Sequence, residues 1–273
     1  MTEACAALVA RDDPHLRATA LFAPEPARSR LMVLYAFDCE LSRAVRASKE
    51  SLIPRMRLQW WRDVLTEAQE GHAPKAHEVA APLVTLVRDG VLDPVDLESM
   101  VRSREAELDR PLEADGYFTW HKFRFQSLVW AAAAVLAQPK ALKEYASPPL
   151  CSYVLSAAYV VRNAPAMAAA GEAPLDGHMA GEGWSLLARR QLSEPIRARF
   201  AALAEEGLEE LGWARGEARL HDPRIRPALL PLARAERVLR LVSNPDFVLD
   251  DLDHADRPFE GLRLAWRMAM GRW

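Results

Sequence analysis

The sequence predicts an all-α protein that folds as a single helical domain over residues 1–273. The 273 residues include 47 Ala but only three Ile and five Thr, so helix-favouring residues far outnumber the β-branched residues that favour strands. Nineteen prolines, which break helix interiors, divide the chain into segments of helical length. Apolar residues recur at intervals of three and four within these segments, and no convincing run alternates polar and apolar residues.

Helices are expected in ten segments of the chain. They are 27–48, 54–70, 76–89, 94–109, 117–138, 148–163, 184–191, 195–213, 224–242 and 258–271, with irregular structure at 70–77, 171–183 and 243–257. In the helix over 54–70, the spacing of Ile53, Met56, Trp60 and Val64 predicts one buried apolar stripe. The helix over 117–138 is apolar all round near its end, which predicts that this part is fully buried.

Charge and cysteine content exclude several classes of protein. The net charge of −3 argues against a protein that mainly binds nucleic acid. The three cysteines are far apart and lack the spacing of a zinc site, which favours a reducing compartment. The longest apolar run, residues 128–137, is far shorter than the roughly 20 residues that span a bilayer, and no secretory signal is evident. We expect a cytoplasmic protein that is soluble or at most peripheral to a membrane.

Four polar residues line one face of the first predicted helix, at offsets of three and four. They are Tyr35, Asp38, Ser42 and Arg46. A carboxylate on a partly apolar face is costly without a partner, so Asp38 is expected to form a salt bridge. The expected partner is Arg57 or Arg62 on the next predicted helix.

The segment Arg57-Leu58-Gln59-Trp60-Trp61-Arg62 is the most unusual stretch of the chain. Neighbouring side chains of a helix point about 100° apart, so the two Trp rings cannot fill one pocket. Two interpretations stay open. The arginines bind an anion or acidic side chains, or the segment supplies a core Trp with arginines whose stems cover apolar surface.

Common catalytic and metal-binding motifs are absent from the sequence. There is no HExxH, GxSxG or P-loop pattern. The acidic loop at 246–256 lacks the glycine and the closing glutamate of an EF-hand, so a solvated loop is expected there.

The C-terminal segment carries an apolar stripe with arginines beside it. The stripe consists of Phe259, Leu262, Trp266, Met270 and Trp273. Two interpretations stay open: a last helix that docks on its own core, or a basic amphipathic helix that lies in a membrane interface.

Several segments together resemble the squalene/phytoene synthase family. Leu34-Tyr35-Ala36-Phe37 precedes the Arg57–Arg62 segment by some twenty residues, and this pair with its spacing carries most of the resemblance. Weaker matches follow at 100–109, 161–165 and 228–233, so the resemblance covers residues 14–270. It implies an isoprenoid synthase fold, a single bundle of helices around a central cavity.

The resemblance also implies where the chemistry of the family would lie. Family enzymes join two prenyl diphosphates, and two cavity helices each carry a DxxxD motif whose carboxylates hold Mg²⁺ against the diphosphate. In this chain the corresponding positions are Ser42, Arg46, Asn163 and Met167. None is a carboxylate, and an arginine there repels a cation.

A branch of the family that has lost these motifs also resembles the chain. This branch includes the mitochondrial respiratory complex I assembly factor and its bacterial relatives, and the resemblance lies in residues 37–41 and 162–165. Pro165 removes a helix hydrogen bond, so the geometry of a DxxxD pair across it is expected to be lost. This resemblance implies a catalytically degenerate protein that acts by binding, as an assembly or accessory factor for a membrane respiratory complex.

Two alternatives stay open. An active prenyltransferase would need Mg²⁺ and other acids, first Glu105 and Asp109, whose spacing of four places them on one helix face. A lipid-binding module would hold an isoprenoid or acyl chain in a wide apolar cavity; a cavity filled by Trp60, Trp61 and Met167 would exclude it.

The candidate cavity and ligand-binding residues combine the polar helix face, the Trp-Trp segment and the positions that the resemblance implies. They are Tyr35, Asp38, Ser42, Arg46, Arg57, Gln59, Trp60, Arg62, Glu105, Asp109, Arg162 and Asn163. No catalytic residue and no metal ligand is assigned, and no cofactor is expected except Mg²⁺ under the prenyltransferase alternative. The expected partner is a protein of a membrane complex or an isoprenoid or other lipid.

Overall fold

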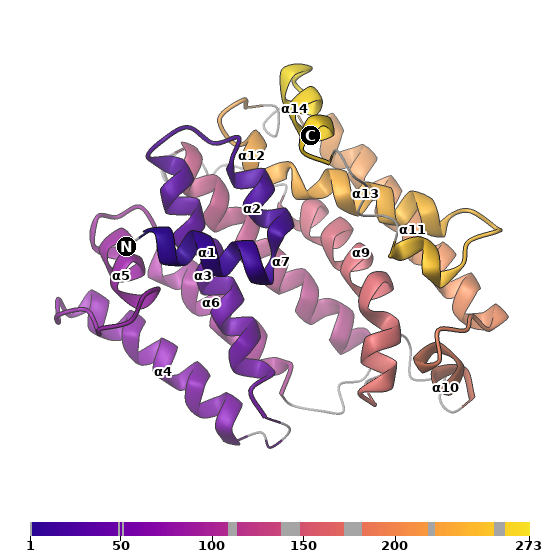
Figure 1. Ribbon diagram of the computed structural model, residues 1–273, viewed down its shortest axis with the longest axis horizontal. Coiled ribbons are helices and arrows are strands. Elements are labelled where there is room, and N and C mark those ends of the chain that lie inside the picture. Colours follow the sequence, from indigo (N-terminus) through magenta and orange to yellow (C-terminus); the bar gives the residue numbers. More distant parts are fainter. Residues whose placement is uncertain are drawn as a thin grey trace.

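The computed structural model describes residues 2–48, 50, 52–108, 114–137, 148–171, 182–217, 222–253 and 260–273. Every regular element in these ranges is a helix, which confirms the all-α prediction (Figure 1). The elements are α1 (Thr2–Asp12), α2 (Pro14–Ala20), α3 (Ala27–Val45), α4 (Leu52–Gln69), α5 (Ala80–Arg88), α6 (Pro94–Ala106), α7 (Ala114–Ala137), α9 (Pro148–Ala169), α10 (Glu182–Ala188), α11 (Glu194–Gly216), α12 (Arg226–Leu229), α13 (Pro231–Val242), the 3-10 turn η3 (Leu249–Leu252) and α14 (Glu260–Ala269).

Each of the ten predicted segments contains a helix, although several boundaries differ. The segment 224–242 is divided into α12 and α13, because Pro231 starts a new helix there. The helix predicted to end at residue 163 continues through Pro165 to Ala169 as α9. No helix was predicted for α1, α2 or η3.

Side-chain caps and prolines together fix the start of two helices. Asp13 accepts a hydrogen bond from the backbone N–H of Leu16, at 3.0 Å, and Pro14 is the first residue of α2. Asp93 caps α6 in the same way, with Pro94 at the first helical position. A short acceptor before a proline satisfies the exposed N–H groups of the first turn and presets its backbone angle.

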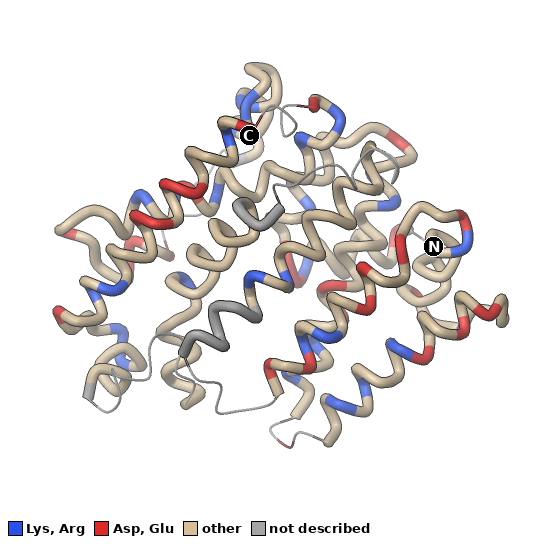
Figure 2. The backbone as a smooth tube through the Cα atoms, turned by 180° about the vertical axis from the view of Figure 1, so that it is seen from behind, with Lys and Arg blue, Asp and Glu red and all other residues tan. Residues whose placement is uncertain are grey.

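Helices α7 and α9 pack against each other at the centre of the molecule (Figure 1). Helices α3 and α6 pack on α7, whereas α10, α11 and α13 pack on α9. One side of α7 contributes Leu128 and Ala132 to the N-terminal core, and another contributes Val129 and Ala133 to the C-terminal core. Residues 128–137 are buried except for Trp130, Ala134 and Leu136, which are half-buried, so the predicted full burial holds for most of this part. Charged residues are sparse at the centre and common on the outer helices (Figure 2).

The apolar stripe predicted for α4 is confirmed only in its second half, where Val64 is buried and Trp60 is half-buried. Ile53 and Met56 are exposed, and the buried face is instead formed by Pro54, Leu58, Trp61, Val64, Leu65 and Ala68. Both sets have helical spacing, so the pattern alone does not choose between them.

The residues of the predicted C-terminal apolar stripe do not all lie on one buried face. Helix α14 docks through Leu264, and the chain end docks through Trp273, both of which are buried. Leu262, Trp266 and Met270 are exposed, and Phe259 lies outside the described residues. None of the helices in the described ranges is long and apolar enough to cross a membrane.

Candidate functional site

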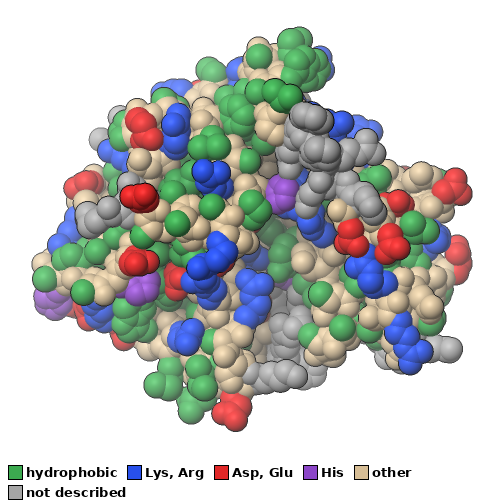
Figure 3. Space-filling view, viewed as in Figure 1, with side chains coloured by type: hydrophobic (Ala, Val, Ile, Leu, Met, Phe, Trp, Pro, Cys, Tyr) green, Lys and Arg blue, Asp and Glu red, His purple; other side chains and the backbone are tan. Residues whose placement is uncertain are grey.

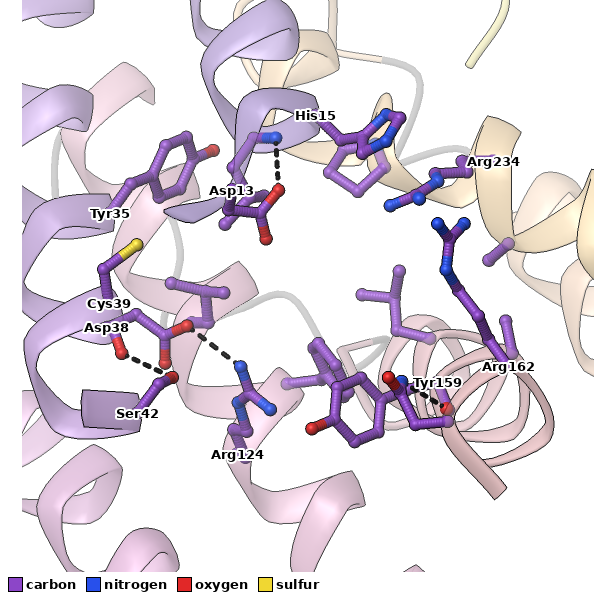
Figure 4. A pocket seen from close by; sticks show the side chains of 18 of the residues that line it. Asp13, His15, Tyr35, Asp38, Cys39, Ser42, Arg124, Tyr159, Arg162 and Arg234 are labelled. Carbon is purple, nitrogen blue, oxygen red and sulfur yellow. Dashed lines mark hydrogen bonds and ion pairs between the residues drawn. The ribbon is translucent and has the colours of Figure 1, made fainter. Parts of the chain in front are cut away.

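A cavity of about 740 Å³ lies between the N-terminal and C-terminal halves of the bundle. Residues of α2, α3, α7, α9 and α13 line it, with Leu264 of α14 at one wall. Figure 3 shows the face of the molecule on which the cavity opens as a hollow with basic side chains around it. Figure 4 shows the labelled side chains converging on the cavity from the start of α2 and from α3, α7, α9 and α13.

One part of the cavity wall is apolar. Its side chains come from α7, α9, α13, α14 and the residue before α13. They are Leu128, Val129, Ala132, Leu155, Ala158, Leu230, Val238 and Leu264. A surface of this kind accepts a hydrocarbon chain, since burial of apolar area against it is favourable.

A buried ion cluster forms a polar part of the wall. Asp38 of α3 accepts hydrogen bonds from Arg104 Nη2 of α6, at 2.9 Å, and from Arg124 Nη2 of α7, at 3.1 Å. Arg104 Nη2 also donates to Ser42 Oγ at 2.6 Å, and Ser42 Oγ donates to the Asp38 carbonyl at 2.9 Å. The cluster therefore ties three helices together at the cavity. Asp38 does form a salt bridge, but its partners are not Arg57 or Arg62.

The charges of this cluster are stable at neutral pH. Burial alone raises the pKa of a carboxyl group, but the nearby guanidinium groups of Arg124 and Arg104 outweigh burial and hold the pKa of Asp38 at about 2. The same carboxylate raises the pKa of Arg124, whose own burial acts in the opposite direction. Both groups are therefore ionised, and two arginines surround one Asp38 carboxylate.

Arg124 carries hydrogen-bonding capacity that the cluster does not use. The residue is only 8% exposed and lines the cavity, and its guanidinium lies over the rings of Phe125 and Tyr159. Its Nε and Nη1 atoms are buried and have no hydrogen-bond acceptor in the described protein. Buried donors normally have partners, so Arg124 can donate to an acceptor held in the cavity (Figure 4).

A second basic group lies at the other end of the cavity. Arg162 of α9 and Arg234 of α13 extend toward one another, and His15 of α2 lies beside them (Figure 4). On the side of the Asp38 cluster, Arg46, the residue after α3, lines the cavity and donates through Nε to the Ser42 carbonyl at 3.0 Å. Converging guanidinium groups favour a negatively charged ligand.

The predicted site residues are divided between the cavity and other places. Tyr35, Asp38, Ser42, Arg46, Arg162 and Asn163 line the cavity. Arg57, Gln59, Trp60, Arg62 and Glu105 are not among the lining residues. Asp109 lies outside the described residues.

The Trp-Trp segment has a structural role in α4. Trp61 is buried against Phe37, with ring centroids 5.1 Å apart, whereas Trp60 is half-buried beside His77. Arg62 donates to both carboxylate oxygens of Glu105, at 2.7 and 2.5 Å, and to Glu98 at 2.9 Å. The structure combines parts of the two open interpretations, since Trp61 is a core residue and Arg62 pairs with acidic side chains.

Sequence reasoning did not select four basic residues of the cavity: His15, Arg104, Arg124 and Arg234. Arg104 belongs to a segment that carries the family resemblance, so its charge in an otherwise apolar helix face was an available signal. Nothing in the sequence places His15 or Arg234 near α3, because these residues come together only when distant helices pack.

Comparisons with known proteins agree with this architecture. The sequence model of the family described as "Squalene/phytoene synthase" matches residues 9–124. A crystal structure of a dehydrosqualene synthase in complex with ligand superposes with a TM-score of 0.79, at 12% identity, and the match covers 98% of this chain and 95% of that chain. The squalene synthase HpnC from Alicyclobacillus acidocaldarius gives a TM-score of 0.70 at 14% identity, with 89% and 95% covered. No curated protein sequence matches significantly.

The chain has the isoprenoid synthase fold. In this fold the four positions that the family resemblance assigned to carboxylates all line the cavity: Ser42 and Arg46 from α3, and Asn163 and Met167 from α9. The two helices thus present a hydroxyl, a guanidinium, an amide and a thioether at these positions. Asn163 directs its amide to the Tyr159 carbonyl, at 2.8 Å.

The carboxylates that do line the cavity do not fit a Mg²⁺ ion held against a diphosphate. Asp38 is held by two arginines, and Glu107 pairs with Arg104 at 3.2 Å. Asp12 pairs with Arg43 at 2.6 Å, and Asp13 caps α2. Among the residues that the structure describes, no three Asp, Glu, His or Cys side chains are arranged to hold a metal ion.

Proposed function

We propose that this chain is a non-catalytic member of the isoprenoid synthase fold, which binds an amphiphile with an apolar chain and an anionic head group. One observation carries the proposal: Ser42, Arg46, Asn163 and Met167 all line the cavity, at the positions that the family resemblance assigned to carboxylates. The cavity is present, while none of these four positions holds a carboxylate that could bind Mg²⁺.

The charge of the cavity supports binding without a metal. Mg²⁺ binds oxygen ligands. In the family that this chain resembles, the ion lies between the carboxylates and the diphosphate, so that the two negative groups do not repel each other. Here Arg46 replaces one such carboxylate, so the attraction to an anion is direct and the attraction to a cation is reduced. Arg124 adds buried N–H donors to this arrangement.

The size and wall of the cavity support a lipid-like ligand. A volume of about 740 Å³ lies within the range of roughly 300–1,000 Å³ that is usual for small-molecule sites. Trp60 and Trp61 do not fill it, although Met167 contributes to its wall. The apolar side chains would hold the hydrocarbon part, and the arginines would hold the head group.

The test is the thermal stability of the protein with farnesyl diphosphate in the presence of EDTA. A ligand that binds only the folded state raises the melting temperature, by about 5 °C or more at a concentration near 100 times its Kd. We expect this rise in EDTA and no further rise when Mg²⁺ replaces EDTA.

Two variants of α9 provide a matched control. Ala166→Trp places a large ring at the lining of the cavity, whereas Ala169→Trp places the same ring on an exposed position that does not line it. We expect A166W to abolish the rise and A169W to retain it. No rise with the unmodified chain, or a rise that requires Mg²⁺, would overturn the proposal.

The active prenyltransferase is less well supported. Glu105, the first acid considered for it, is held by both terminal nitrogens of Arg62 and does not line the cavity. Its suggested partner Asp109 is not among the described residues. That alternative predicts Mg²⁺-dependent stabilisation, which the same experiment measures.

An assembly role for a membrane respiratory complex is a second candidate, supported by the resemblance at residues 37–41 and 162–165 and by the loss of the metal-binding residue types. It predicts that deletion of this chain lowers the amount of assembled complex I while other respiratory complexes are unchanged. Normal assembly without the chain would exclude this role.

A further inference from the structure

Helix α14 presents an apolar face to the outside of the molecule. Leu262, Trp266 and Met270 are 67%, 57% and 54% exposed, and their spacing of four residues places them on one side of the helix. Figure 3 shows hydrophobic side chains gathered at the top of the molecule, over α14. Because Leu264 already anchors the helix to the core, these three side chains are not needed to hold α14 in place.

Arginines surround this face. Arg263 and Arg272 are exposed on α14 and just after it, and Arg240 is exposed on α13. A groove of about 460 Å³ between the two helices is lined by Arg237, Arg240, Arg263 and Arg267 together with Trp266. A row of guanidinium groups beside an exposed Trp is suited to phosphate groups at an apolar boundary.

Arginines outnumber acids among the described residues that line the groove. Among the described residues, Glu236 is the only acid that lines it, and this side chain is buried beneath three arginines. Arg215, Arg240 and Arg267 bind it at 2.6, 2.9 and 3.1 Å. One carboxylate fixes the base of the groove, and Arg263 and Trp266 remain at its outer side.

We propose that α14 and the groove beside it dock on the surface of a bilayer that contains anionic phospholipids. Leu262, Trp266 and Met270 would enter the interface, and the arginines would contact the phosphates. Interfacial helices combine a Trp-containing apolar face with arginines in this way. The positive charge favours this occupant over a second copy of the chain, whose α14 would carry the same charge.

The docking surface adjoins the cavity. Leu264 lines both the groove and the cavity. A chain docked through α14 would therefore hold one wall of its cavity close to the lipid phase. The proposal for α14 stands on its own exposed residues and does not depend on what the cavity binds.

The test is flotation of the full chain with vesicles of two compositions. We expect binding to phosphatidylcholine vesicles that contain about one-third phosphatidylglycerol, and little binding to phosphatidylcholine alone. Raising the salt concentration should weaken the binding, since it screens the arginines. Arg263→Glu should lower the partition coefficient about tenfold, while Arg102→Glu, an exposed reversal on α6, should not change it.

Matched apolar variants locate the contact. Leu262→Ser with Met270→Ser should lower binding at least about tenfold through the lost apolar burial. Leu52→Ser with Met56→Ser removes the same two residue types from α4, where they are 66% and 63% exposed, and should leave binding unchanged. Trp266→Ser and Trp213→Ser, the latter 56% exposed on α11, form a second matched pair. Because all these side chains are exposed, the variants are expected to fold.

Three results would overturn the proposal. One is the failure of the unmodified chain to float with anionic vesicles. Another is flotation that is unchanged in L262S/M270S and in W266S, or that is lost in the α4 control variant L52S/M56S. The third is a dimer that forms through α14, seen as a mass change in light scattering that L262S/M270S reverses, without vesicle binding.

Discussion

Asp38 is the residue on which the polar wall of the cavity depends. Its carboxylate joins α3 to Arg104 of α6 and Arg124 of α7, and all three side chains are almost fully buried. The sequence predicted that Asp38 needs a partner, since a buried acid without one is costly. It could not name the partner, because Arg104 and Arg124 are 66 and 86 residues away along the chain.

Removing the Asp38 charge should destabilise the protein strongly. Asp38→Asn leaves two buried arginines without their counter-ion, and loss of one partner in a buried pair typically costs about 3–5 kcal/mol. Asp63→Asn, which alters an exposed hydrogen bond to Gln59, should cost about 0.5 kcal/mol or less. Urea unfolding at neutral pH measures both. Equal, small effects would show that the Asp38 cluster contributes little.

Acid should weaken the fold through two carboxylates. Burial acts to raise the pKa values of Asp38 and Glu236, but their arginine partners hold both at about 2, below the usual values of 3.8 and 4.5. The unfolded chain therefore takes up protons first as the pH falls. The stabilisation that these two carboxylates contribute is fully present above their usual pKa values and is lost progressively as the pH falls toward 2. For Asp38 the loss amounts to roughly 2 kcal/mol.

Urea unfolding at pH 7 and pH 3 checks this expectation. The free energy of unfolding should be lower at pH 3, and the pH dependence should be reduced in Asp38→Asn. A protein that is equally stable at both pH values would contradict the assigned pKa directions.

At the scale of elements, the periodic apolar pattern located most helices but not always their buried faces. In α4 two sets of residues have helical spacing, and only the packing of α3, α5 and α6 around it decides that Trp61 is buried while Met56 is exposed. In α14 the apolar pattern likewise did not identify the buried face, since Leu264 is buried whereas Leu262 and Trp266 are exposed. Helices α1 and α2 were missed because residues 1–20 show no extended apolar stripe.

The contact of α11 with α13 depends on a glycine. A Cβ atom at Gly207 would lie 2.7 Å from Leu239 Cδ1 and 3.6 Å from Ala157 Cβ, so the helices approach closely there. Gly212, on the same helix, has nothing within 4 Å of such an atom. We expect Gly207→Leu to destabilise the fold by about 1–3 kcal/mol through overpacking. Gly212→Leu should stabilise it by up to about 1 kcal/mol through helix propensity. Thermal unfolding of both variants is the measurement, and a stable G207L would show that the interface is loosely packed.

For the whole molecule, the sequence alone was sufficient to predict the fold class. Half of the candidate residues that it named line the cavity. The polar face of α3 and the residues Arg162 and Asn163 were found because they lie at fixed offsets from recognisable segments. Arg124 and Arg234 were not found, because their place in the cavity results from the packing of α7 and α13 against distant helices. Long-range packing, rather than local pattern, determines the charge of the site.

The central claim, that the isoprenoid synthase fold is kept here without its metal-dependent chemistry, can be tested by diphosphate release. The purified chain is incubated with Mg²⁺ and either farnesyl or geranylgeranyl diphosphate, beside a dehydrosqualene synthase as positive control. We predict release at the rate of the no-protein control, because Ser42, Arg46, Asn163 and Met167 supply no carboxylate to the cavity. Mg²⁺-dependent release above that control would contradict the claim.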